Sequence, residues 1–250
     1  MERIGNVYAS INTCTYVSVK SMTIDILYSL TFEDGQTTDF ELKFDDGTMA
    51  LIADQEVSPP VWAQLDEHKC PHCPLNSDSH PHCPPALHLA KAVNRLGSIV
   101  SYADVNLRVV TAEREMMGKT SVQTVLSSIM GLLMATTGCP YTAYLRPMAR
   151  FHLPLASFEE TIFRSVSAYL VAQYLLGREG QPFDTSLGGL VKIYEDIQIV
   201  NVSFANRLKY SGEIIETNAI TLLDMFAQSL PLAIDESLEE FRGLFQSYLE

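Results

Sequence analysis

Residues 66–88 hold most of the side chains in this chain that can bind a metal ion. The segment reads DEHKCPHCPLNSDSHPHCPPALH, and it contains three of the 5 cysteines and five of the 6 histidines. Cys70 and Cys73 form a C-x-x-C pair, in which one tight turn presents two thiolates to the same ion. A second knuckle, HPHCP, adds Cys83 and two histidines. These ligand types at this spacing predict a metal site.

Two ligand sets fit the pattern. The first joins the three cysteines of the segment to His80, with His82 as a substitute, and it suits zinc. The second set replaces the histidine with Cys139, which lies far along the chain but is also followed directly by proline. An all-thiolate set suits zinc or an iron–sulfur cluster. Zinc is the expected cofactor, a cluster is the alternative, and a proline-stiffened loop without metal is the remaining interpretation.

Cys139 and His152 offer a different chemistry, that of a thiolate enzyme. A cysteine beside a base or a cation can act as a nucleophile, and Arg146 and Arg150 lie between these two residues in the sequence. However, Cys139 follows a predicted helix, and the negative end of a helix dipole disfavours a thiolate. The sequence therefore leans against an enzyme, and no catalytic residue is assigned.

Composition excludes several classes of protein. Hydrophobic residues make up 47% and charged residues 19%, which is typical of a globular chain. With 17 Lys and Arg against 30 Asp and Glu, the net charge of −13 gives no basic footprint for nucleic acid. The apolar run near residues 129–135 is far too short to cross a bilayer. Because MERIGNVYAS is not a secretory signal, we expect thiols rather than disulfides and a cytoplasmic location.

The N-terminal part is predicted to be a small antiparallel sheet. Apolar residues alternate with mostly polar ones over residues 24–32 and 40–44, and the EDGQ turn between them contains Asp34-Gly35, which suits a tight hairpin. Residues 104–111 also alternate and are expected to join the same sheet. The chain thus divides into a hairpin region (1–60), a Cys/His loop (61–86) and a mainly helical region (87–250), which together form one integrated α+β domain.

The remaining sequence predicts helices. One begins at Pro84-Pro85, a helical region starts near Thr120, and Ser157 opens a further helix as part of a capping box with Glu160. Near the C-terminus, Pro231 is expected to separate two helices, at roughly 213–229 and 232–249. The whole is a C-terminal helical bundle. Polar residues on these helices are expected to form a solvated face, with a buried network as the alternative: Asp196, Asn201, Asn206, Arg207, Asn218 and Asp224.

Two sequence blocks, CPHCPL…HCP and GCPYTAYLRPMARFHLPLASFEETIFR, resemble a family of uncharacterised bacterial proteins that is a domain of unknown function. The similarity covers the chain from about residue 21 to near the C-terminus. The resemblance implies a bacterial protein with one integrated domain in which the Cys-Pro blocks belong together. It implies no activity, so no site residue follows from it.

The leading hypothesis is a non-enzymatic, cytoplasmic protein with a structural zinc site that acts through self-association or an unknown protein partner. A closed shell of protein ligands leaves no position for a substrate, so the ion stabilises the fold. The alternative is an iron–sulfur or thiol redox protein that uses Cys70, Cys73, Cys83 and Cys139. A thiolate enzyme that uses Cys139 and His152 is the second alternative.

Overall fold

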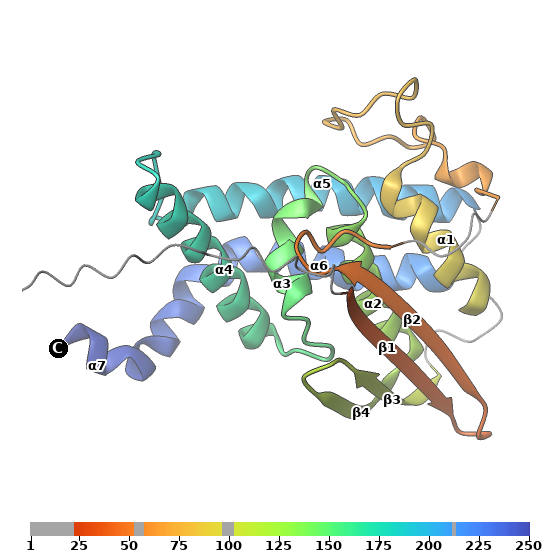
Figure 1. The fold of residues 1–250 in the computed structure, drawn as a ribbon, viewed down its shortest axis with the longest axis horizontal. Helices are drawn as coiled ribbons and strands as arrows, with labels where there is room; N and C mark the ends of the chain where they lie inside the picture. The colour runs from red at the N-terminus through yellow and green to blue at the C-terminus, as the bar shows by residue number, and fades with distance from the viewer. Residues whose placement is uncertain (1–22, 53–57, 97–102, 212–213) are drawn as a thin grey trace, which may run out of the picture.

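The computed structural model describes residues 23–52, 58–96, 103–211 and 214–250. A twisted antiparallel sheet lies at one end of this part of the chain, and helices extend from it along the long axis (Figure 1). The architecture is α+β. Cys14 and the rest of residues 1–22 lie outside the described residues.

The sheet has the strand order β2-β1-β3-β4, with every neighbouring pair antiparallel. Strands β1 (Thr23–Phe32) and β2 (Thr37–Asp45) form the expected hairpin, and Gly35 takes the positive φ of 83° in its turn. Strand β3 (Asp104–Val110) pairs with β1 on the other side. Alternate side chains of the two central strands enter the core: Ile26, Tyr28, Leu30, Val105, Leu107 and Val109.

Strand β4 (Glu115–Ser121) is not predicted by the sequence, although the helical region after it starts close to Thr120 as expected. Helix α2 (Val122–Thr136) begins after this strand, and the Ser121 hydroxyl caps it by accepting a bond from the Thr124 N–H. No residue of β4 is fully buried, so this edge strand lacks the apolar alternation that would reveal it. Gly118 has a packing role, because a Cβ there would lie 2.8 Å from Leu155 Cδ1.

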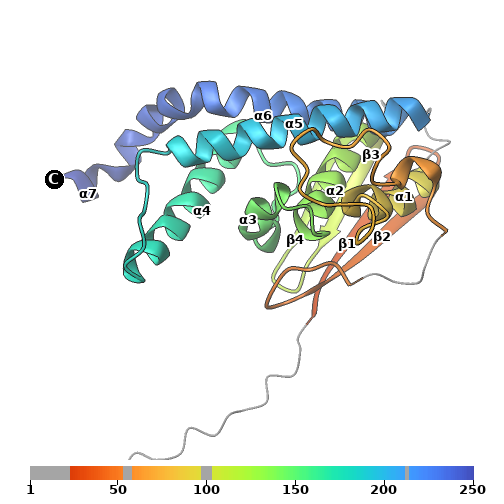
Figure 2. The same cartoon turned by 90° about the horizontal axis from the view of Figure 1, so that it is seen from above.

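Helix α2 is apolar on almost all sides and lies between the sheet and the long helices α5 (Gly188–Ser211) and α6 (Ile214–Phe241), which run side by side (Figure 2). The others are α1 (Pro84–Leu96), α3 (Arg146–Arg150), α4 (Phe158–Arg178) and α7 (Gln246–Leu249). The capping box predicted at the start of α4 is confirmed: the Ser157 hydroxyl accepts from the Glu160 N–H, and the Glu160 carboxylate accepts from the Ser157 N–H.

Helix α6 also corrects a prediction, since it continues through Pro231 instead of ending before it. Proline removes one backbone donor from a helix, here the N–H that would bond to the Ala227 carbonyl. Leu230 and Ile234, on either side, are buried in a second apolar cluster with α4 and α5. The free energy gained by burying these two side chains outweighs the loss of one backbone hydrogen bond.

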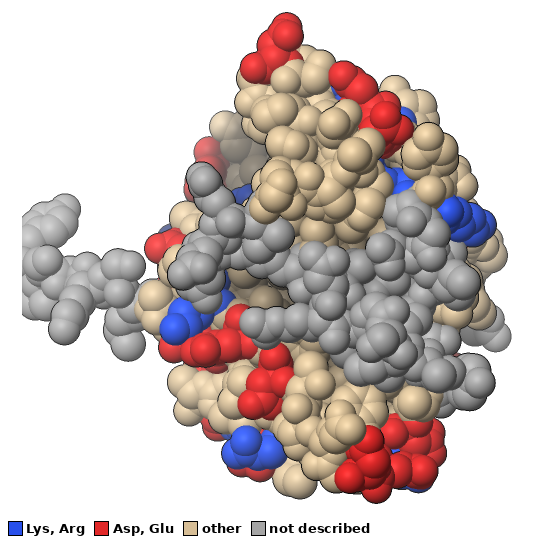
Figure 3. Space-filling model, turned by 90° about the vertical axis from the view of Figure 1, so that its right-hand side faces the viewer, with Lys and Arg blue, Asp and Glu red and all other residues tan. Residues whose placement is uncertain are grey.

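Charged side chains are dispersed over one face of the molecule (Figure 3). On the face in Figure 3, Lys and Arg side chains form small separate patches among acidic and uncharged ones. Across the described residues, no helix combines the length and the apolar character that crossing a membrane requires.

Candidate metal centre

Three cysteines of the Cys/His loop and Cys139, which follows α2, lie within range of one another's charge. Burial raises the pKa of Cys70 to about 11, and negative charge on Cys83, Cys139 and Cys73 acts in the same direction. Cys70, Cys83 and Cys139 also pack against the main core. All four are free thiols. The four cysteines of the all-cysteine ligand set therefore share one region of the structure.

Backbone hydrogen bonds fold the Cys/His loop so that its ends meet. The Cys73 N–H donates to the Cys70 carbonyl at 3.0 Å, which closes the turn of the C-x-x-C pair. At the base of the loop, the Cys83 N–H donates to the Ala63 carbonyl at 2.8 Å. The loop lies above α5 and α1 in Figure 1, where it is drawn in orange and yellow.

Cys83 stands at the N-terminal end of α1, next to Pro84. The Ala86 N–H donates to its thiol, and the positive charge of Arg207 is also close; both interactions lower the pKa of Cys83, but burial outweighs them and raises it. A backbone N–H in the first turn of a helix has no partner within the helix and can stabilise a thiolate sulfur. The position of Cys83 therefore suits a ligand to a cation.

Arg207 links α5 to the loop. Its side chain is buried, and it donates hydrogen bonds to the carbonyl oxygens of Trp62, Gln64 and Leu65. Its positive charge also acts on Cys83 and on other thiols of the group. Arg207 therefore does not belong to a solvated face, and the preferred interpretation of the polar helix residues is wrong at this position.

Tyr141 joins the second Cys-Pro block to the first. Its ring stacks on the imidazole of His72 with centroids 3.9 Å apart, and its hydroxyl donates to the His72 carbonyl at 2.7 Å. His72 Nε2 lies 3.1 Å from the Asp196 carbonyl of α5. Because His72 precedes Cys73 and Tyr141 follows Cys139 by two residues, this contact sets the two cysteines near each other.

The histidines of the first ligand set have other contacts. His80 is exposed, and its Nδ1 lies 3.0 Å from the Ser79 hydroxyl. His82 forms an isolated antiparallel bridge with Gln64 through its backbone. His152 lies beside α2 and β1, where its Nε2 contacts the hydroxyls of Ser128 and Tyr28. The structure thus places His152 and Cys139 in different surroundings.

The thiols are neighbours without forming a finished coordination shell. Among the residues described, no three His, Cys, Asp or Glu side chains converge closely enough to hold an ion. A tetrahedral zinc site requires Zn–S distances of about 2.3 Å. Rotation of the thiols and adjustment of the loop would have to bring the four sulfurs together.

The sequence favours a solvated position for Arg207 and predicts no role for Tyr141. On α5, Arg207 falls beside Phe204 and Leu208, which are part of the apolar spacing that predicts the buried face of this helix. The signal in the sequence that could have revealed its burial is a positive charge next to the apolar residues of the buried helix face. Tyr141 gave no comparable signal, because its partner His72 lies 69 residues away.

Comparison with protein families agrees with the resemblance of the two Cys-Pro blocks. A family described as a domain of unknown function (DUF6901) matches residues 26–246. The chain belongs to this family. The match includes the four gathered cysteines, Tyr141 and Arg207, and the family description assigns them no activity. No curated protein and no solved structure matches the chain.

Proposed function

We propose that this chain is a non-enzymatic protein in which a zinc ion, bound by Cys70, Cys73, Cys83 and Cys139, fastens the Cys/His loop to the helices. The observation that carries the proposal is the approach of Cys139, just after α2, to three cysteines of the loop. Sulfur ligands in a set of four are typical of structural zinc. The ion would join segments whose cysteines are up to 69 residues apart.

Charge supports this arrangement. Four thiolates and one Zn²⁺ together carry two negative charges, and a buried centre of that kind needs nearby positive charge or N–H donors. Arg207 supplies the positive charge, and the Ala86 N–H supplies a donor to Cys83. A closed shell leaves no position for substrate, so the ion would stabilise the fold and take no part in turnover.

The same four thiols also suit an iron–sulfur cluster, which remains the alternative cofactor. Either cofactor requires reduced cysteines, which fits a cytoplasmic location in a bacterium. The visible absorption spectrum distinguishes the two cofactors, because zinc–thiolate sites are colourless and iron–sulfur clusters absorb visible light.

Self-association is the second part of the proposal, and α4 is the helix that supports it. The N-terminal half of α4 buries Ile162 and Val166, whereas its C-terminal half exposes large apolar side chains: Leu170, Val171, Tyr174, Leu175 and Leu176. Residues 167–177 carry no charge, in a chain of net charge −13. A second copy could therefore pack on this face without charge repulsion across the contact.

Metal content per chain tests the proposal directly. We expect about one zinc per chain by elemental analysis of protein purified without oxygen and without an affinity-tag metal. The Cys73→Ser variant should lose the zinc and unfold at a lower temperature, whereas Cys14→Ser, which changes the fifth cysteine, should do neither. Full zinc retention by Cys73→Ser would count against the four-cysteine shell. Iron with acid-labile sulfide would establish the cluster instead.

A further inference from the structure

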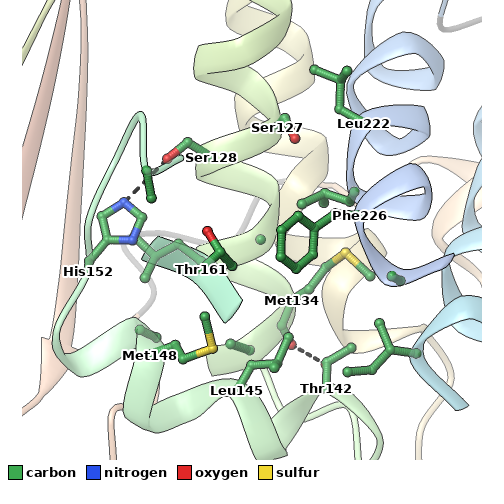
Figure 4. Close-up of a pocket in the computed structure, with 18 of the residues that line it drawn as sticks. Ser127, Ser128, Met134, Thr142, Leu145, Met148, His152, Thr161, Leu222 and Phe226 are labelled. Carbon is green, nitrogen blue, oxygen red and sulfur yellow. Dashed lines mark hydrogen bonds between the residues drawn. The ribbon is translucent and has the colours of Figure 1, made fainter. Parts of the chain in front are cut away.

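A cavity of about 330 Å³ lies between α2, α3, α4, α5 and α6, away from the cysteines. Figure 4 shows Ser128 and His152 on one side of it and Leu222 and Phe226 on the other. Its walls are mainly aliphatic and aromatic, and Leu145 contributes to them. Sites for small molecules commonly have volumes of about 300–1,000 Å³ and apolar walls with a few polar groups. The size and lining of this cavity fit that description.

His152 provides a neutral hydrogen-bonding group in the wall. Burial and, as the smaller cause, the charge of Arg164 lower its pKa to about 4, so the imidazole is neutral at pH 7. Its Nε2 faces the hydroxyls of Ser128, at 3.4 Å, and Tyr28. Within the described residues, its Nδ1 makes no hydrogen bond. This nitrogen remains available to a ligand.

Asn201 provides a second polar group. It is 2% exposed and lines the cavity from α5. Buried amides in folded proteins almost always have partners, because an unpaired one is destabilising. A polar ligand in the cavity would give the Asn201 amide a hydrogen-bond partner. The prediction of a solvated position for Asn201 is wrong, because the residue is buried.

Arg164 supplies the charge. The residues that line the cavity include no Asp or Glu, and Arg164 is the one among them that is ionised at neutral pH. Its Nη2 donates to the carbonyls of Met148, at 2.7 Å, and Phe151, at 2.8 Å. A guanidinium has five N–H donors in a planar fork, so others remain for an anion. The cavity therefore carries a positive charge in its wall, although the chain as a whole is acidic.

We propose that this cavity binds a medium-chain aliphatic carboxylic acid, with the hydrocarbon chain among the apolar side chains and the carboxylate on Arg164. His152 and Asn201 add neutral hydrogen bonds for the polar end of the ligand or for a water beside it. The proposal is independent of the metal centre.

Binding, and not hydrolysis, is the activity that this arrangement favours. Ser128 and His152 lie close together, as in a nucleophile–base pair, but such a base needs a carboxylate or similar group to orient its other nitrogen. The lining offers no carboxylate, and Nε2 is shared with Tyr28.

Calorimetric titration of the full chain with decanoate and with 1-decanol tests the proposal, because the two probes share a chain and differ in charge. Decanoate should bind more tightly than decanol to the unaltered protein. In the Arg164→Gln variant, the affinity for decanoate should fall roughly tenfold or more while that for decanol stays constant, since a charge-assisted hydrogen bond is lost.

A second variant checks the location. Ala156 lines the cavity from a partly exposed loop position just before α4, so Ala156→Phe narrows the cavity at a place that tolerates a larger side chain. It should weaken both probes, with circular dichroism unchanged. Equal affinity for decanoate and decanol, or unchanged decanoate binding in Arg164→Gln, would overturn the proposal. Unchanged binding of both probes in Ala156→Phe would do so as well.

Discussion

The ring of Tyr141 stacks on the imidazole of His72 at a centroid distance of 3.9 Å, and the Tyr141 hydroxyl donates to the His72 carbonyl. This pair joins two segments that are far apart in the sequence, of which one carries three cysteines of the candidate metal centre and the other carries Cys139. The contact also occupies His72, whose Nε2 is within hydrogen-bonding distance of the Asp196 carbonyl. His72 therefore positions the loop segment that carries the neighbouring Cys73.

Substitution of Tyr141 should weaken both the fold and zinc binding. Tyr141→Phe keeps the ring and loses one hydrogen bond, so the free energy of unfolding should fall by about 1 kcal/mol; Tyr141→Ala also loses the stacking, for a total of about 2 kcal/mol. Urea denaturation and competition with a coloured zinc chelator measure the two effects. Tyr144, which is 62% exposed in the same turn, gives the matched control Tyr144→Ala. Unchanged zinc affinity in Tyr141→Ala would argue against this role.

The fourth ligand can be identified by comparing two variants. Cys139→Ser should lose most of the zinc, because Cys139 is near the other thiols, whereas His80→Ala should retain it, because His80 is exposed and contacts Ser79. Elemental analysis after dialysis against a weak chelator gives the comparison. The reverse result would restore the set of Cys70, Cys73, Cys83 and His80.

Removal of Arg207 should destabilise the chain strongly. Arg207→Ala leaves buried carbonyls of the Cys/His loop without donors, and we expect the free energy of unfolding to fall by about 3 kcal/mol. Arg207→Lys should recover part of this loss, since it keeps the charge with fewer donors. Lys209→Ala, at an exposed position on the same helix, is the control. A change below about 0.5 kcal/mol in Arg207→Ala would contradict this account.

His152 should make stability depend on pH. Its folded pKa of about 4 lies below the ordinary value of 6.5, so its contribution is fully present above pH 6.5 and is lost as the pH falls toward 4. The slope should approach 1.4 kcal/mol per pH unit in that window. The groups that face the imidazole are the hydroxyls of Tyr28 and Ser128 and the guanidinium of Arg164.

Titration of the His152 ring by NMR measures this pKa directly. Comparison of urea denaturation at pH 7 and pH 4.5 then measures its effect on stability. The His152→Gln variant should show a smaller loss between these two pH values than the unaltered chain. Titration of His152 near pH 6.5 would show that the ring is solvated and would remove the basis of the prediction.

Self-association through α4 should be sensitive to charge. The Val171→Glu, Leu175→Glu double variant places two like charges on the exposed apolar face, so sedimentation velocity should show a shift from dimer to monomer. Leu232→Glu, at a position 86% exposed on α6, should leave the assembly unchanged. A chain that is monomeric without any substitution would refute self-association.

Local patterns in the sequence were sufficient for much of the fold. The β1–β2 hairpin and the capping box of Ser157 follow from residues a few positions apart, and both are confirmed. The expected family is confirmed as well. Local patterns failed where packing overrides them. Pro231 lies within α6 because buried neighbours hold the helix, and β4 pairs with β3 without an apolar pattern of its own.

The sequence by itself determined that Cys70 and Cys73 lie together, because a C-x-x-C turn is closed by a hydrogen bond between those two residues. Only the tertiary structure decided that Cys139 approaches them, since that depends on how α2 packs between the sheet and α6. It also decided that Arg207 and Asn201 are buried. A helix pattern shows which residues share a face, but the partner of that face comes from a distant part of the chain.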